Sequence, residues 1–247
     1  RACRRVCRNS AHEFASYLFS VTYDVEGYTR WLLGRRNHGR AMRWHRRVLQ
    51  YLQLRSRDNT SGYRDNRWLL KTPQFTMQLD DVVLEYPDAI IIQTHRDPAE
   101  AVGSSASVHA RTFGAASDTI DLRRIGRQQH DLAEEWLKRA AASRARLRER
   151  GVTVIDIKLQ DLKRDPIAAV DAVYRHLGQD FSATTRARMN SWVAKRQVRY
   201  GAHKFSLKDF GLQARSMVNS SPVLRAYCDE FGLKGEGCSP ADTALEN

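Results

Sequence analysis

One junction in the chain restricts the fold more than any other feature. Residues 89–94 (AIIIQT) are nearly all apolar and rich in β-branched side chains, which is typical of a central parallel strand covered on both faces. Residues 97–100 (DPAE) follow with a good N-cap, a proline suited to the first helical position and a glutamate three residues past the cap. A buried strand that leads directly into a helix indicates an α/β fold.

The same alternation continues on both sides of this junction. Residues 67–71 (RWLLK) and 152–157 (VTVIDI) are further candidate strands. Apolar side chains at helical spacing predict helices within 10–57, over about 76–86 and 128–150, and from Pro166 to Leu177. We therefore expect 67–71, 90–95 and 152–157 to be parallel neighbours in one sheet with helices on both faces.

Length and charge limit the partners of the chain. Its 247 residues fit one large domain, and its net charge of +13 suits nucleic acid, an anionic membrane surface or a polyanionic small ligand. The basic stretches 35–57 and 139–150 carry apolar residues at helical spacing, so solvated helix faces explain most of their arginines. No stretch approaches the ~20 apolar residues of a membrane helix, and no apolar segment follows the basic N-terminus. We expect a cytoplasmic protein without a membrane span.

The chain has four cysteines, Cys3, Cys7, Cys228 and Cys238. They form no CxxC or CxxH pair, which argues against a zinc site. Free thiols in a reducing compartment are the preferred interpretation, and a disulfide between the two ends of the chain is the alternative.

Ligands of parallel sheets bind beyond the carboxyl ends of the strands, where two candidates stand. Lys71 follows the first strand and can neutralise a phosphate or sulfate oxygen, or it is simply solvated. Arg96 follows the second strand beside a helix start, where a guanidinium fork and free N–H groups favour an anion. Ser104 lies eight residues later and can donate to the same anion. The alternative is that Arg96 merely pairs with Asp97 or Glu100.

A third candidate lies near the C-terminus. Residues 195–205 are basic, contain a glycine and look like a loop, and they include Arg199 and Lys204. Such a segment can close over a phosphate, although an exposed basic loop is an equally good interpretation.

Five segments in this order resemble the sulfotransferases that use 3′-phosphoadenosine-5′-phosphosulfate (PAPS), particularly the bacterial-type group with LKTPQH, FPDA and THRDP motifs. The resemblance runs from about Glu13 to Leu233. The matching segments are 70–75 (LKTPQF), 86–89 (YPDA), 94–98 (THRDP) with Ser104, the pairs Asp161-Leu162 and Asp165-Pro166, and 203–212 (HKFSLKDFGL).

The resemblance implies a three-layer, P-loop NTPase-like α/β fold with an added helical region. It implies one domain, 1–247, with a helical acceptor or lid region at 10–66 and an α/β core at 67–233. Arg96 and Ser104 would hold the 3′-phosphate of the donor, Lys71 would lie near the transferred sulfuryl group, and Lys204 or Arg199 would contact the 3′-phosphate.

The same resemblance implies the reactants. PAPS would be the donor and adenosine 3′,5′-bisphosphate the product, with a small-molecule or carbohydrate acceptor. Neither a metal nor a nucleic acid would take part.

Two features depart from the family. No segment resembles its 5′-phosphosulfate loop (GxPRSGT[ST]) and the chain begins with Arg1, so we expect a domain that is incomplete at its N-terminus; a natural degenerate form is the alternative. Phe75 stands where the family usually has a histidine, and phenylalanine cannot accept the acceptor's proton. Either His12, Glu13 or His45 serves as the base, or activity is lost.

Other function classes therefore stay open. A P-loop kinase or another nucleotide phosphotransferase shares this architecture, but it needs a Walker lysine loop and an acidic Mg²⁺ ligand, which the sequence does not show. A basic module that binds nucleic acid or sulfated glycans would use the arginine-rich helices. An inactive sulfotransferase relative is the third alternative, and Phe75 favours it.

Overall fold

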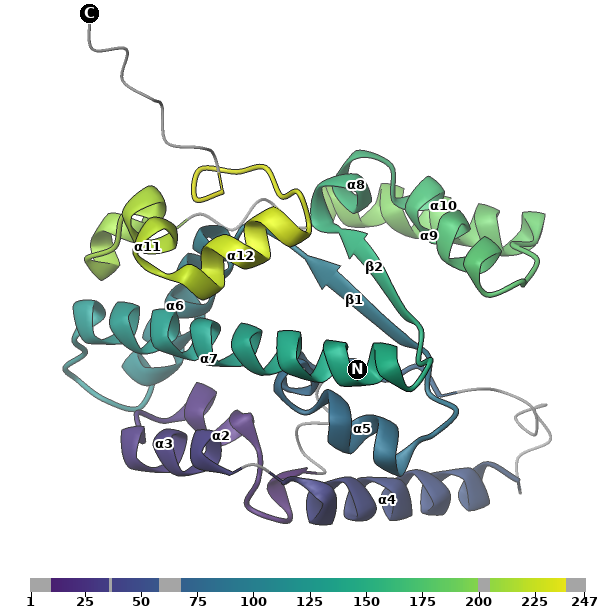
Figure 1. Cartoon of the computed structure of the whole chain (residues 1–247), viewed down its shortest axis with the longest axis horizontal. Helices are drawn as coiled ribbons and strands as arrows, with labels where there is room; N and C mark the ends of the chain where they lie inside the picture. Colours follow the sequence, from purple (N-terminus) through teal and green to yellow (C-terminus); the bar gives the residue numbers. More distant parts are fainter. Residues whose placement is uncertain (1–9, 36, 58–67, 200–204, 239–247) are drawn as a thin grey trace, which may run out of the picture. The chain divides into compact units, whose positions relative to one another are not determined.

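The computed structural model describes residues 10–35, 37–57, 68–199 and 205–238, and it is mostly helical with one parallel sheet (Figure 1). The chain forms two compact units. Unit 1 comprises Arg1–Ala89, Val108–Ile120 and Glu135–Gly151, and unit 2 comprises Ile90–Ser107, Asp121–Glu134 and Val152–Asn247. The predicted division into 10–66 and 67–233 stays a prediction.

The described part of unit 1 before residue 86 is mostly helical, as the apolar spacing within 10–57 and over 76–86 predicts. The buried side chains Ala15, Leu32, Ala41 and Met77 form the centre of its core. Tyr17, Tyr28, Leu33 and Trp136 pack against this centre. The helical elements are α2 (Tyr17–Thr22), α3 (Glu26–Gly34), α4 (Gly39–Arg57), the 3-10 helix η2 (Pro73–Met77) and α5 (Leu79–Glu85).

The second half of α7 (Leu122–Glu149) is tied into unit 1 by ion pairs and hydrogen bonds. Arg146 Nη2 lies 2.6 Å from Asp80 Oδ2, and the Ser143 hydroxyl donates to the same oxygen. The Arg146 hydrogen bond lowers the pKa of Asp80. Arg139 donates to the carbonyl oxygens of Leu33 and Arg35, which fixes the end of α3 against α7.

Two histidines of unit 1 are buried. His38 precedes α4 and His45 lies within it, and both are at most 1% exposed. Burial lowers the pKa of each from 6.5 to about 4. His45 Nδ1 lies 2.7 Å from the Tyr86 hydroxyl, while His45 Nε2 has no hydrogen-bond partner within the described part of the chain.

The sheet lies in unit 2 and confirms two of the three predicted strands. β1 (Ile91–His95) and β2 (Val154–Lys158) pair in parallel, with Ile91 opposite Val154 (Figure 1). The predicted strand at 67–71 is wrong over the described residues 68–71, which form no strand. Leu69 is 81% exposed there, and the two described strands pair only with each other. An isolated extended segment lacks the partner that would satisfy its backbone.

The two faces of the sheet differ in burial. His95 is buried on one face, where it stacks on Phe231 of the C-terminal region with ring centroids 3.7 Å apart. On the opposite face Ile92 is 42% exposed, although Ile155 beside it is buried. The predicted burial of β1 on both faces is therefore wrong for Ile92.

Helix starts and stops agree with the sequence signals. α6 (Pro98–Gly114) begins after Asp97, whose Oδ1 accepts the Ala99 N–H at 2.8 Å. Asp165 caps α9 (Pro166–His176) in the same way, and α8 (Leu159–Arg164) lies between β2 and α9. Gly151 after α7 has a φ of 70°, a left-handed value that glycine adopts without strain.

The C-terminal region is more helical than the sequence indicates. Residues 195–199 end a helix, so the predicted loop at 195–205 is wrong for them; residues 200–204 lie outside the described residues. Residues 205–210 pack tightly on α6 and α7, because a Cβ on Gly103 would lie 2.3 Å from Phe205 and one on Gly126 2.2 Å from the Phe210 carbonyl oxygen. The elements are α10 (Ala183–Arg199), η3 (Leu207–Phe210), α11 (Ala214–Ser220) and α12 (Pro222–Glu230).

A disulfide joins Cys228 of α12 to Cys238. The expectation of free thiols is therefore wrong for these two residues, whose pairing closes a short loop inside the C-terminal region. Cys3 and Cys7 lie outside the described residues. None of the described helices is both long enough and apolar enough to cross a membrane.

We predict that Gly126→Ala lowers the free energy of unfolding by roughly 1–3 kcal/mol, because the new methyl group overlaps the Phe210 backbone. Denaturant unfolding measures the change. Gly27→Ala in α3 is the matched control, since nothing lies within 4 Å of its Cβ position. We expect this control to stabilise the protein slightly, as alanine replaces glycine in a helix. Equal effects of the two substitutions would contradict the packing.

We predict that stability falls as the pH drops from about 6.5 to about 4. In this window the unfolded chain binds more protons than the folded one, because His38 and His45 titrate near 6.5 when unfolded and about 4 when folded. Each histidine contributes up to about 3 kcal/mol at neutral pH. Denaturant unfolding at several pH values gives the free energy of unfolding as a function of pH. Between about pH 6.5 and 4 this free energy should fall less steeply for His45→Gln than for the wild type. The exposed His12→Gln should leave the slope unchanged.

Candidate anion-binding site

Arg96 stands at the end of β1, and the residue before it is firmly anchored. His95 is 1% exposed, its Nδ1 lies 2.9 Å from the Tyr227 hydroxyl, and its Nε2 lies 2.8 Å from Asp156 Oδ1. These contacts join β1 to β2 and α12. His95 thus has a structural role, and the Arg96 backbone is set on a rigid element.

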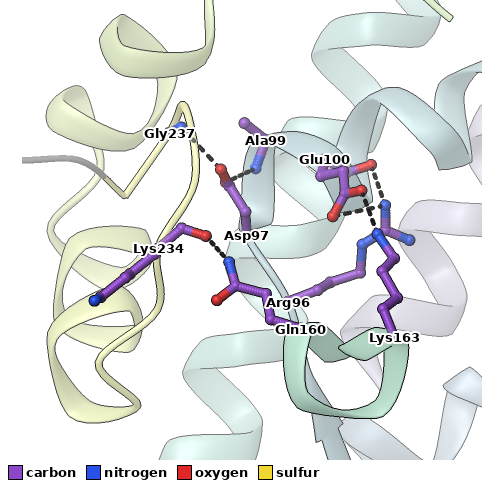
Figure 2. A network of polar contacts seen from close by, with 8 residues as sticks. All are labelled: Arg96, Asp97, Ala99, Glu100, Gln160, Lys163, Lys234 and Gly237. Atoms are coloured by element: carbon purple, nitrogen blue, oxygen red, sulfur yellow. Dashed lines mark hydrogen bonds and ion pairs between the residues drawn. The ribbon is translucent and has the colours of Figure 1, made fainter. Parts of the chain in front are cut away.

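The Arg96 side chain pairs with Glu100 (Figure 2). Its Nη2 donates to the Glu100 carbonyl oxygen at 2.9 Å and lies 3.4 Å from Glu100 Oε2. Its Nε is buried and has no hydrogen-bond partner among the described residues. The pairing with Glu100 that the sequence left as an alternative therefore exists, while the carboxylate of Asp97 faces other groups.

Lys163 of α8 also contacts Glu100. Its Nζ lies 3.1 Å from Glu100 Oε1, so one carboxylate bridges two cations (Figure 2). The three side chains are between 31% and 60% exposed. Sequence analysis missed Lys163, although its place just after β2 is a weak signal for such a role.

Ser104 lies one turn beyond Glu100 on α6. Glu100 and Ser104 are four residues apart and share one stripe of α6, while Arg96 lies in the short connection that precedes the helix. Ser104 is half-buried, and Gly103 before it is covered by the Phe205 ring. The chain that resumes at residue 205 therefore lies directly beside the helix turn of Ser104.

The two C-terminal candidates are only partly described. Arg199 is the last residue of α10, and its side chain lies outside the described part of the structure. Lys204 lies outside the described residues altogether. Their predicted contacts with a phosphate stay predictions.

Lys71 belongs to unit 1, whereas Arg96 and Ser104 belong to unit 2. Lys71 is exposed, and the residues after it are well anchored. The Thr72 hydroxyl accepts the Gln74 N–H and caps η2. Gln74 is 3% exposed; its Oε1 accepts the Tyr17 N–H and its Nε2 donates to the Ala15 carbonyl oxygen, both at 2.9 Å. The motif thus fixes the start of α2.

The three candidate bases differ in their surroundings. His12 is exposed beside the Trp44 ring, and Glu13 forms an ion pair with Arg40. His45 is buried, with its ring edge-on to Phe75 at a centroid distance of 6.3 Å. Of the three, His45 is the one in contact with the residue that replaces the family histidine.

The cluster around Arg96 combines charges that an anion site would use. It holds two cations and one carboxylate, and the ion pairs are exposed enough to contribute little to stability. An incoming phosphate could therefore replace Glu100 as the partner of Arg96 and Lys163, with charge-assisted hydrogen bonds from both. In the described part of the chain no three His, Cys, Asp or Glu residues gather as metal ligands.

Comparisons with known proteins bear on the family and the fold. A model of the sulfotransferase family matches residues 2–183. The fold is similar to that of sulfotransferase STF9 from Mycobacterium avium, with a TM-score of 0.74 and 24% identity over 90% of this chain and 54% of that one. It is also similar to sulfotransferase STF1 from Mycobacterium tuberculosis, with a TM-score of 0.62 and 26% identity over 80% of this chain and 48% of that one.

The chain thus spans about half the length of the two solved sulfotransferases. No curated protein matches it. The mixed α/β architecture with its parallel sheet is the fold of these enzymes. Because the family model covers well over half of the sequence, the chain belongs to the sulfotransferase family.

Proposed function

We propose that this chain binds the 3′-phosphate of PAPS and belongs to an enzyme that transfers the sulfuryl group to an acceptor hydroxyl. The observation that carries this proposal is the Arg96 guanidinium, set at the end of β1 and sharing Glu100 with Lys163. Arg96 would hold the phosphate with its planar fork, and Ser104 would add a neutral donor from α6. Arg199 or Lys204 would contact the phosphate from the chain before Phe205.

The proposed reaction is an in-line displacement at sulfur. The acceptor oxygen loses its proton to a base and bonds to sulfur, while the bond from sulfur to the 5′-phosphate oxygen breaks. The products are a sulfate ester and adenosine 3′,5′-bisphosphate. Lys71 would be the catalytic cation that stabilises the charge on the departing oxygen, and the reaction would need no metal.

The acceptor would be a small molecule or a carbohydrate, bound by the helical region at 10–66, while 67–233 would form the donor-binding core. A kinase-like phosphotransferase is disfavoured by the family match. An inactive relative stays the second candidate, because Phe75 occupies the position of the family histidine and His45 beside it is buried.

The compartment stays a prediction. A cytoplasmic location is expected from the sequence, and the Cys228–Cys238 disulfide is the observation that weighs against it, because disulfides are rare in reducing compartments.

We predict that Arg96→Ala weakens binding of adenosine 3′,5′-bisphosphate at least about tenfold, because a charged hydrogen bond is worth roughly 1.5–3 kcal/mol. Arg96→Lys should restore only part of the affinity, since an ammonium group cannot form the fork. Ser104→Ala should cost about 1 kcal/mol. Isothermal titration calorimetry measures all three variants.

Two controls separate recognition from folding. Adenosine 5′-phosphate, which lacks the 3′-phosphate, should bind weakly and show almost no dependence on Arg96. Arg175→Ala removes an exposed guanidinium of α9 that pairs with Asp171, and it should leave both titrations unchanged. Equal losses for the two nucleotides in Arg96→Ala would show that Arg96 supports the fold and would defeat the proposal.

We also predict that Glu100→Gln strengthens binding of adenosine 3′,5′-bisphosphate by roughly threefold to tenfold. The substitution keeps the shape but removes a negative charge that competes for Arg96 and Lys163 and repels the phosphate. Binding should also become less sensitive to Lys163→Ala in this background. Weaker binding by Glu100→Gln would mean that the carboxylate orients Arg96 rather than competing with the ligand.

A further inference from the structure

A short segment after α12 lies against Asp97, the residue that follows Arg96. We call residues 232–238 (GLKGEGC) the strap. Its last residue, Cys238, is joined to Cys228 of α12 by the disulfide, and Cys228 is 4% exposed. Cys238 is half-buried and thus the more accessible sulfur.

Three hydrogen bonds attach the strap to the ends of the two strands. The Gly237 N–H donates to Asp97 Oδ2 at 2.9 Å, directly after β1. Lys158 Nζ at the end of β2 donates to the Gly232 carbonyl oxygen at 3.3 Å, and the Gln160 side-chain amide donates to the Lys234 carbonyl oxygen. Figure 2 shows Gly237 facing Asp97 and Lys234 facing Gln160, while the Arg96 side chain reaches toward Glu100.

The fit of the strap on Asp97 depends on glycine. A Cβ on Gly235 would lie 2.2 Å from Asp97 Oδ2, and a Cβ on Gly237 would lie 2.6 Å from Asp97 Oδ1 and 2.8 Å from the Ala99 Cβ. Distances this short leave no room for a methyl group. The strap therefore approaches the carboxylate as closely as a backbone can.

Asp97 connects the strap to the site. It is 6% exposed; its Oδ1 accepts the Ala99 N–H at the start of α6, and its Oδ2 accepts the Gly237 N–H. A buried carboxylate that loses one donor seeks another, because an unsatisfied charge is costly. The guanidinium of the preceding residue, Arg96, is the cation next to it in the chain. With the strap in place, both oxygens of Asp97 accept a hydrogen bond. The Arg96 guanidinium then pairs with Glu100 or with a phosphate rather than with Asp97.

We propose that the strap is a positioning element for the donor's 3′-phosphate, and that the Cys228–Cys238 disulfide makes this affinity depend on redox state. This inference rests on the proposed function of Arg96. The disulfide holds the strap on Asp97; once it is reduced, the strap leaves, and Asp97 draws Arg96 away from the phosphate.

The redox step is thiol–disulfide exchange with a dithiol reductant. A thiolate of the reductant attacks Cys238 Sγ, the S–S bond breaks, and Cys228 leaves as a thiolate that takes up a proton. The second thiol of the reductant then releases Cys238, so the cysteine pair gains two electrons and the dithiol becomes a disulfide.

The test is calorimetric titration of the oxidised and the reduced chain with adenosine 3′,5′-bisphosphate. Reduction with dithiothreitol should weaken binding roughly fivefold to tenfold, about the effect of losing one charge-assisted hydrogen bond. Reoxidation should restore it. Adenosine 5′-phosphate should bind equally to both forms, and circular dichroism should confirm that the reduced chain stays folded. In Arg96→Ala, reduction should cause no further loss.

Two variants separate the strap from other effects of the reductant. Gly235→Ala pushes the strap off Asp97 with the disulfide intact, so the oxidised variant should bind as weakly as the reduced wild type. The double substitution of Cys3 and Cys7 by serine leaves the Cys228–Cys238 pair unchanged, and it should respond to reduction as the wild type does.

The outcomes are distinguishable. An oxidised wild type that does not bind adenosine 3′,5′-bisphosphate overturns the proposed function, and the role of the strap with it. An oxidised wild type that binds, but equally well after reduction, overturns the role of the strap alone. Equal losses for both nucleotides on reduction would mean that the disulfide only stabilises the fold, and would also overturn it.

Discussion

Two hydrogen bonds to the Asp97 carboxylate hold together the end of β1, the start of α6 and the C-terminal region of unit 2. The carboxylate is buried; one of its oxygens accepts the N–H of nearby Ala99, and the other accepts the N–H of Gly237, which lies 140 residues after Asp97. Backbone donors compensate a buried carboxylate well, because they are fixed in direction and carry no charge that would need burial of its own. Asp97 thereby connects the end of β1 with the start of α6 and with the C-terminal region. The backbone of the neighbouring Arg96 is held in a defined position as a result.

The ion pairs around this point contribute little to the stability of the fold. Glu100 is shared between Arg96 and Lys163, and all three side chains are partly exposed. Pairs of this kind add little to folding, yet they keep two cations oriented toward one place while no ligand is bound. If the proposed function holds, Glu100 would take over the two cations when a product as highly charged as the donor leaves.

Sequence predicted what depends on neighbours in the chain. The strand at 91–95, the capped start of α6 and the position of Arg96 follow from local signals, and all three are found. Residues 68–71 form no strand, although their apolar composition predicted one. A strand needs a neighbouring strand to pair with, and composition does not show whether such a neighbour exists. The disulfide, Lys163 and the strap were missed for the same reason: each acts through a contact between segments far apart in sequence, or through a loop whose shape composition does not reveal. The roles of Lys71, Arg199 and Lys204 are still predictions.

Gln74 shows how narrow the chemical tolerance of one motif position is. Its side-chain amide copies a peptide group, since it accepts from the Tyr17 N–H and donates to the Ala15 carbonyl oxygen. Deamidation to glutamate would change the mass by about one unit and the shape hardly at all. The new oxygen would nevertheless face the Ala15 oxygen, two acceptors without a proton between them, in a place that is 3% exposed. Loss of a single amide by chemical ageing would thus turn an attraction into a repulsion at the start of α2.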